Sequence, residues 1–238
     1  MWKSIIHKKT SIKNPVLIEG LPGIANVGKI VVDYMIEELE ADLLRTYFSH
    51  DLPNTVFVNE ENLVELPKLG VFHKKVNGQD FLFLAGDVQP KGERASFEFT
   101  EKLLDETKKA GLKEIVTIGG VGYSEPPSEI KVYCTGNDKS FVDTFEADKD
   151  IYGVVGPIIG ITGLLIGLSK QRNVKGGTLL AETYNHPMHL GIREAKEVLK
   201  ILNKKYNMGI SFKEIDKEID EQDNKKEQPN IHETSYIG

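Results

Sequence analysis

The sequence predicts an α/β fold, a three-layer α/β/α sandwich in which helices cover both faces of a mostly parallel central sheet. Two observations predict it. Short runs of β-branched and aromatic residues alternate along the chain with amphipathic segments of helical period, which is typical of βαβ units. The chain has 238 residues, of which 39% are hydrophobic, and this is enough for one buried core between such layers.

In the first half of the chain, turn and cap signals separate the predicted elements. Asn77 and Gly78 form a dipeptide that favours the tight type I′ turn of a β-hairpin. Gly111 suits the left-handed conformation that commonly ends a helix. The predicted strands are residues 16–20, 43–48, 55–58, 63–75 and 80–85, and the predicted helices are residues 26–40 and 95–110.

The second half continues the alternation. The predicted strands are residues 114–118, 130–135, 141–147 and 178–181, and the predicted helices are residues 162–172 and 191–206. Residues 151–169 form a run of nineteen residues without a charged side chain, which is nearly the length of a membrane span. Because glycines and Pro157 interrupt this run, it is interpreted as a buried loop followed by a core helix.

Composition excludes several classes of protein. The net charge of −6 argues against nucleic acid and anionic membranes as partners. Cys134 is the single cysteine, so neither an internal disulfide nor a cysteine-rich zinc module is possible. The first ten residues lack the apolar run and cleavage site of a secretory signal. A cytoplasmic protein is expected.

The charge pattern predicts a boundary near residue 212. Residues 1–212 are expected to form a single α/β/α domain. From Lys213 to Glu227, eleven of fifteen residues are charged, and Ile215 and Ile219 are the only ones suited to anchoring a helix turn. Residues 213–238 are therefore predicted to be a charged, flexible C-terminal tail.

A glycine-rich loop follows the first predicted strand and opens the first predicted helix. Its distinctive positions are Gly20, Pro22, Gly23, Asn26 and Gly28. Glycines at such a turn serve either of two purposes. They let the backbone pass close to neighbouring strands, or they present backbone N–H groups to a ligand such as a phosphate.

The same loop nearly matches a nucleotide-binding motif. Gly23, Gly28 and Lys29 have the spacing of a Walker A loop, but the next position is Ile30 where magnesium coordination requires serine or threonine. Pro22 also removes one backbone donor. The pattern therefore disfavours NTP hydrolysis.

Other candidate sites are weaker. The cluster Gly119–Gly122 lacks the spacing of a dinucleotide fingerprint and is interpreted as a sharp turn. Glu182, His186 and His189 are interpreted as a loop with surface histidines, because Pro187 breaks the helix that would present both imidazoles together. Cys134 is expected to be a small buried hydrophobe. No catalytic residue, metal site or cofactor is predicted.

Four segments, in this order along the chain, resemble the type-2 proteasome assembly chaperone family and its archaeal homologues. They are residues 17–29, 117–122, 156–165 and 178–183. The resemblance spans most of residues 14–208. It implies an architecture similar to nucleoside phosphorylases without their catalytic residues. It also implies a homo-oligomer larger than a dimer, which assists the assembly of proteasome α-subunits without enzymatic activity.

The resemblance also assigns a role to the C-terminus. In this family a terminal hydrophobic-tyrosine-any tripeptide can dock between α-subunits. Here the chain ends in Ser235, Tyr236, Ile237 and Gly238, so the tyrosine is third from the end and serine takes the hydrophobic position. The expected partner of these four residues is the proteasome α-subunits or a partner chaperone.

Two hypotheses follow from the sequence. The first is an ATP-independent, homo-oligomeric proteasome assembly chaperone that binds its partner in part through the C-terminal tail. The alternative is a nucleotide- or nucleoside-binding enzyme that uses the loop from Gly20 to Lys29, because open α/β sheets place ligands at the carboxyl ends of their strands.

Overall fold

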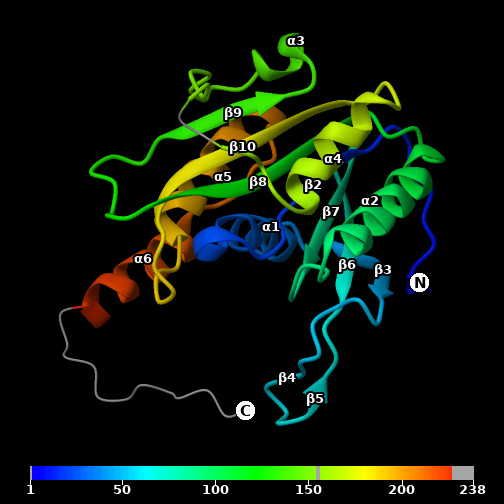
Figure 1. The fold of residues 1–238 in the computed structure, drawn as a ribbon, viewed down its shortest axis with the longest axis horizontal. Coiled ribbons are helices and arrows are strands. Elements are labelled where there is room, and N and C mark those ends of the chain that lie inside the picture. Colours follow the sequence, from blue (N-terminus) through cyan, green and yellow to red (C-terminus); the bar gives the residue numbers. More distant parts are fainter. Residues whose placement is uncertain (1, 154–155, 227–238) are drawn as a thin grey trace.

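The computed structural model describes residues 2–153 and 156–226. Within these ranges the chain forms one large sheet with helices on both faces (Figure 1). The strands in sheet order are β1 (Lys3–Ile6), β3 (Asp42–Phe48), β6 (Leu69–Val76), β7 (Gln79–Gly86), β2 (Val16–Glu19), β8 (Glu114–Tyr123), β10 (Lys175–Tyr184) and β9 (Val132–Gly136). The helices are α1 (Val27–Glu38), α2 (Glu93–Lys108), α3 (Lys139–Val142), α4 (Ile161–Lys170), α5 (Ile192–Tyr206) and α6 (Lys213–Lys226).

The sheet is mixed, so the prediction of a mostly parallel sheet is wrong. Its central strands β7, β2, β8 and β10 are parallel to one another. On one side β6, β3 and β1 add antiparallel strands, and on the other side β9 pairs antiparallel with β10. The β6–β7 hairpin explains much of the difference, because a two-residue turn can join only antiparallel strands. The Asn77-Gly78 turn itself is as predicted, with φ of 49° and 84° at its two residues.

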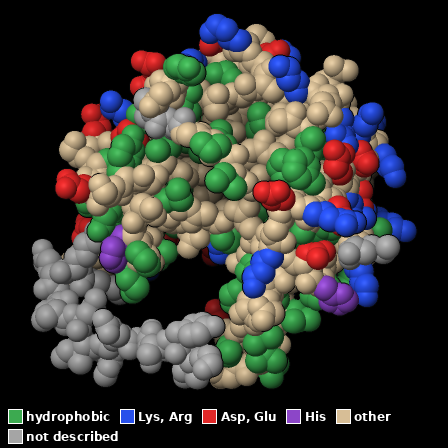
Figure 2. All heavy atoms as spheres, in the orientation of Figure 1, with side chains coloured by type: hydrophobic (Ala, Val, Ile, Leu, Met, Phe, Trp, Pro, Cys, Tyr) green, Lys and Arg blue, Asp and Glu red, His purple; other side chains and the backbone are tan. Residues whose placement is uncertain are grey.

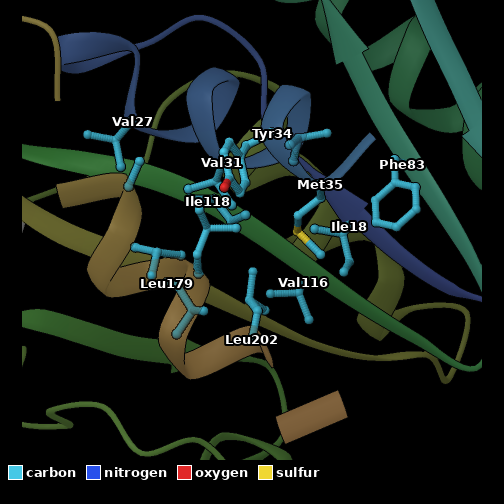
Figure 3. Packing of buried hydrophobic residues seen from close by; sticks show 14 of the residues in the cluster. Ile18, Val27, Val31, Tyr34, Met35, Phe83, Val116, Ile118, Leu179 and Leu202 are labelled. Carbon is cyan, nitrogen blue, oxygen red and sulfur yellow. The ribbon is translucent and has the colours of Figure 1, made fainter. Parts of the chain in front are cut away.

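Each face of the sheet carries its own hydrophobic core. Consecutive residues of β2 show the division, because Ile18 packs with α1 and α5 whereas Leu17 packs with α2 and α4. Figure 3 shows the first core, where Met35 of α1 and Leu202 of α5 meet Val116 of β8. A strand buried on both faces is apolar at successive positions, which explains the continuous run that predicted β2. The three predicted layers are therefore present.

The prediction of a strand at residues 141–147 is wrong. Their first two residues complete the short helix α3, and turns follow. The side chain of Asp138 accepts a hydrogen bond of 2.8 Å from the backbone N–H of Phe141 and so caps the start of this helix. Phe141 and Phe145, four residues apart, then pack edge to face with ring centroids 5.2 Å apart, whereas four residues of extended strand would separate them by about 13 Å.

In the long uncharged run of residues 151–169, the helix is present as predicted, but the loop before it differs from the prediction. Helix α4 buries Ile161 and Leu165 against the sheet. The preceding loop was expected to be buried, but Tyr152 and Ile159 are almost fully exposed. None of the helices in the described ranges has the length and apolar character that a membrane crossing demands.

Residues 213–226 are the helix α6, so the prediction of a flexible tail from residue 213 does not hold for them. Ile215 and Ile219 are buried, and Ile215 belongs to the core on the α1–α5 face. The hydroxyl of Tyr34 donates to the carbonyl of Ser211 at 2.9 Å, just before the helix. An ion pair between Arg193 and Asp223 joins α6 to α5. Two buried isoleucines, one turn apart, are thus enough to hold a highly charged helix.

Candidate functional site

The four segments that carry the family resemblance come together at one pocket. It lies at the carboxyl edge of the parallel strands and has a volume of about 430 Å³. Its lining comes from residues 21–28, 118–122 and 156–162, together with Leu180 of β10 and Gln89. Only Gln89 lies outside the four segments. The segments are far apart in the sequence, so the fold alone brings them to one place.

Close backbone packing accounts for two glycines of the loop. A Cβ atom on Gly20 would lie 2.0 Å from the carbonyl oxygen of Gly28. A Cβ atom on Gly28 would in turn lie 2.5 Å from the carbonyl oxygen of Ile118 in β8. Real Cβ atoms do not approach backbone so closely, so α1 can start against the ends of β2 and β8 only with glycine at both positions.

Of the remaining loop positions, two lie at the pocket, whereas Ala25 and Asn26 line a separate cavity. Gly23 lines the pocket, and a Cβ atom there would meet nothing nearer than 4.0 Å, so packing does not require this glycine. The carbonyl of Pro22 accepts a hydrogen bond of 2.7 Å from Gln89. Ala25 and Asn26 have φ of 50° and 54°, a left-handed conformation that costs about 1–3 kcal/mol at each non-glycine residue. The fold therefore maintains a strained turn at the mouth of α1.

Lys29, the lysine of the near-Walker pattern, pairs with a carboxylate and does not line the pocket. Lys29 Nζ binds the carboxylate of Asp33 at 2.6 Å, one helical turn further along α1. Lys29, Asp33 and Asp87 line a separate cavity. None of the residues that line the 430 Å³ pocket carries a charged side chain. The pocket thus lacks the cation that a triphosphate requires.

A carboxylic acid lies buried beside the pocket. Glu19, the last residue of β2, is fully buried, and its Oε1 accepts hydrogen bonds from the backbone N–H of Leu21 at 3.2 Å and from the hydroxyl of Thr162 at 3.3 Å. Its Oε2 has no hydrogen-bond partner in the described part of the chain. Burial raises the pKa of Glu19 to about 8 despite these hydrogen bonds, which lower it. Glu19 is therefore mostly protonated at neutral pH.

Glu19 was not predicted as a site residue, although a signal for it is present in the sequence. A glutamate that ends an otherwise apolar strand, directly before a glycine loop, is unusual. Leu21 and Thr162 both line the pocket, and the backbone N–H of Leu21 and the hydroxyl of Thr162 both donate to the carboxyl group. Glu19 thus lies directly behind the pocket wall.

Glu182 and His189, two residues of a weaker candidate site, have different partners in the structure. Glu182 accepts hydrogen bonds from the hydroxyls of Tyr123 and Tyr133, whereas His189 Nε2 pairs with Glu194 at 2.8 Å. In the described ranges, no three His, Cys, Asp or Glu side chains gather closely enough to hold a metal ion. Cys134 is buried, as predicted, and burial raises its pKa to about 12.

A second candidate surface is a hairpin that projects from the body. Strands β4 (Phe57–Val58) and β5 (Val64–Glu65) form a separate two-stranded sheet in the connection between β3 and β6 (Figure 1). Val58 and Val64, which pair across it, are 67% and 68% exposed. Figure 2 shows hydrophobic side chains gathered on this projection. The exposed members are Val56, Phe57, Val58, Leu63, Val64 and Leu66.

This hairpin surface was not predicted. Periodicity showed extended segments at residues 55–58 and 63–75, but exposure depends on where the hairpin stands relative to the sheet. A contiguous apolar patch at the tip of a projection is typical of an interaction site. The four predicted tail residues, Ser235 to Gly238, lie outside the described residues.

Comparison with known proteins assigns a family to the chain. The model of the PAC2 family matches residues 17–228, which include all four segments named above. Among curated proteins, the uncharacterized protein MJ1210 of Methanocaldococcus jannaschii is 25% identical over 221 residues. That match covers 91% of this chain and 84% of the relative.

Solved structures give the same fold. PbaB of Pyrococcus furiosus, described as an archaeal proteasome activator, has a TM-score of 0.84 and 27% identity, covering 95% of this chain and 99% of PbaB. PbaA of the same organism, described as an archaeal homolog of proteasome-assembly chaperone, has a TM-score of 0.77 and 20% identity, covering 94% of this chain and 89% of PbaA.

Proposed function

The chain belongs to the PAC2 family, as its four sequence segments predicted, and we propose that it is an ATP-independent, homo-oligomeric scaffold that assists proteasome assembly. Its partners are proteasome α-subunits or a partner chaperone. The single observation that carries this proposal is the match of the PAC2 family model to residues 17–228, because it includes all four segments through which the sequence resembles proteasome assembly chaperones. The likeness to nucleoside phosphorylases remains a prediction from the resemblance, and the cytoplasmic location remains a prediction from the composition and the N-terminal sequence.

The apolar hairpin supports the homo-oligomer. Its six exposed hydrophobic side chains are left uncovered by the described part of the chain, and a second copy of the protein would cover them. A contact between the hairpin of one copy and a different surface of the next is heterologous, and such contacts generate rings when the rotation closes. This geometry supports an oligomer larger than a dimer.

The proposed role of the C-terminus adds avidity to such a ring. Several tails displayed by one oligomer raise their effective concentration at the partner without any single strong contact. Tyr236 offers a large contact area at small entropic cost, and the carboxylate of Gly238 offers a charge-assisted hydrogen bond. Ser235 and Ile237 flank the tyrosine.

Two tail variants test this role against the full-length protein. Deleting residues 235–238 is expected to weaken capture of proteasome α-subunits at least tenfold without a change in melting temperature or oligomeric mass. Appending one residue after Gly238 is expected to weaken capture as well, because it displaces the carboxylate. If both variants capture the α-subunits as the full-length chain does, the tail is not the docking segment and the globular surface alone binds.

Activation of the assembled proteasome is a second candidate function. The name of PbaB favours it, since PbaB matches this chain with a higher identity and TM-score than PbaA does. Measuring peptide hydrolysis by assembled proteasome, with and without the protein, separates the two roles. A several-fold stimulation would support activation, whereas binding to free α-subunits without stimulation would support assembly.

Two observations argue against phosphate binding, which is one part of the alternative enzyme hypothesis. Lys29 is paired with Asp33, and the pocket beside the glycine loop has no charged lining. What remains of that hypothesis is a pocket suited to a neutral ligand.

A further inference from the structure

The pocket between the four family segments has a construction that restricts its occupant. Its volume of about 430 Å³ lies within the range of small-molecule sites. Its side chains are apolar except for the amide of Gln89 and the hydroxyl of Thr162, and none is charged. An anionic ligand would lose its hydration without gaining a cation, so the pocket favours an uncharged one.

Backbone forms much of the pocket wall. Six of its lining residues are glycines, from the α1 loop, from the end of β8 and from the segment before α4. Because these residues have no side chains, peptide groups form this part of the wall. A flat ring system with donors and acceptors on its edge fits such walls better than a branched aliphatic molecule does.

Two features indicate a built site and not a packing gap. Glu19 keeps an unpartnered carboxyl oxygen behind the wall, and its other oxygen is bonded to Thr162, which lines the pocket. Buried polar groups without partners are rare, so an unpartnered carboxyl beside a pocket indicates a missing partner. The amide of Gln89, the second polar side chain of the lining, is held in position by a hydrogen bond of 2.7 Å to the carbonyl of Pro22.

We propose that this pocket binds an uncharged heteroaromatic small molecule of about nucleoside size, and that the phosphorylated form of such a molecule is excluded. Glu19, through Thr162, positions the polar side of the pocket. Because burial keeps Glu19 protonated at neutral pH, it adds no negative charge beside the ligand. All residues that line this pocket belong to the globular domain, so the proposed ligand binds to the domain and not to the C-terminal tail.

Adenosine and AMP are the probes that test this inference, because they differ by one phosphate. Isothermal titration of the full-length protein is expected to give adenosine a dissociation constant at least tenfold below that of AMP. Adenosine is also expected to raise the melting temperature, since a ligand of the native state stabilises it.

Pocket variants locate the binding. Gly23→Phe fills the pocket from a position with free space, and Ile159→Asp places a charge at its exposed rim. Both are expected to weaken adenosine binding at least tenfold. The matched control is Gly167→Phe, at an exposed glycine of α4 that also has free space and does not line this pocket. It is expected to bind adenosine as the unmodified protein does.

Three results would overturn the inference. The first is the absence of adenosine binding, and the second is AMP binding of equal strength. The third is retention of adenosine binding in both pocket variants. Failure of the adenosine experiment leaves the proteasome proposal intact, because capture of α-subunits is measured separately.

Discussion

Gly20 and Gly28 set the position of helix α1 at the scale of single residues. Each would place a Cβ atom against backbone, at 2.0 Å and 2.5 Å, and backbone cannot move aside as a flexible side chain can. The glycine loop is therefore required by packing at these two positions. Gly23 in the same loop has free space, so its role lies with the pocket.

Alanine substitutions separate these two roles. Gly20→Ala is expected to lower the free energy of unfolding by about 3 kcal/mol or more, because α1 must shift away from β2. Gly23→Ala is the matched control, and a change within about 1 kcal/mol is expected, because its backbone conformation suits any residue. Urea denaturation measures both. Equal effects of the two substitutions would refute the packing explanation.

Glu19 makes the stability of the fold depend on pH. Its pKa in the native state is raised to about 8 by burial, from an ordinary value of 4.5. Below pH 4.5 both states are protonated and its contribution to stability is fully present. As pH rises toward 8 the unfolded state releases the proton first, so this contribution is progressively lost.

Glu19→Gln removes this titration. The variant is expected to be more stable than the unmodified protein by as much as about 4 kcal/mol at pH 8, with the difference shrinking toward pH 4.5. Thermal unfolding across this pH range, at constant ionic strength, measures the difference. A difference that does not change with pH would show that Glu19 is ionised in the native state.

At the scale of elements, α6 shows how few apolar residues hold a charged helix. Ile215→Ala is expected to lower the free energy of unfolding by about 2–4 kcal/mol, because the side chain is fully buried. Ile5→Ala is the matched control, since Ile5 is exposed and a change of about 0.5 kcal/mol or less is expected. No loss of stability in Ile215→Ala would mean that α6 does not contribute to the core.

We expect the proposed oligomer to depend on the hairpin β4–β5. Replacing Val58 and Val64 together by aspartate is expected to lower the oligomeric mass measured by light scattering while the melting temperature of the domain changes little, because both side chains are exposed. Met188→Asp, at an exposed hydrophobic residue elsewhere, is expected to leave the mass unchanged. An unchanged mass in the hairpin variant would place the interface on another surface.

Local signals predicted the elements better than their arrangement. The Asn77-Gly78 turn, the cap at Gly111 and the core strand β2 follow from short-range chemistry, and the structure has all three. Strand direction in the outer half of the sheet depends on tertiary pairing, so alternation of strands and helices did not reveal it. The many charged residues of α6 led to the prediction of a flexible tail. The helix is stabilised by contacts with α1 and α5, which its own composition does not reveal.

The candidate site was predictable in part. The four segments were identified from the sequence, but their convergence on one pocket required the fold. The exposed hairpin and the unpartnered oxygen of Glu19 depend on which groups neighbours cover, and no spacing rule encodes that.

At the scale of the whole molecule, the pocket and the hairpin occupy one edge. β2 and β7 are parallel, and Leu69 at the start of β6 pairs with Gly86 at the end of β7. The connection that carries the hairpin therefore leaves from the same carboxyl edge that holds the pocket. The proposed self-association surface and the proposed ligand pocket are thus both assigned to this edge, outside the buried layers.

The central claim is that the full-length chain binds proteasome α-subunits as an oligomeric scaffold without a nucleotide. Native mass spectrometry of the protein mixed with α-subunits, in the absence and presence of ATP and magnesium, tests it most directly. We expect a complex of defined stoichiometry, containing more than two copies of this chain, at equal abundance in both conditions. A monomeric chain that forms no complex, or a complex that appears only with ATP, would contradict it.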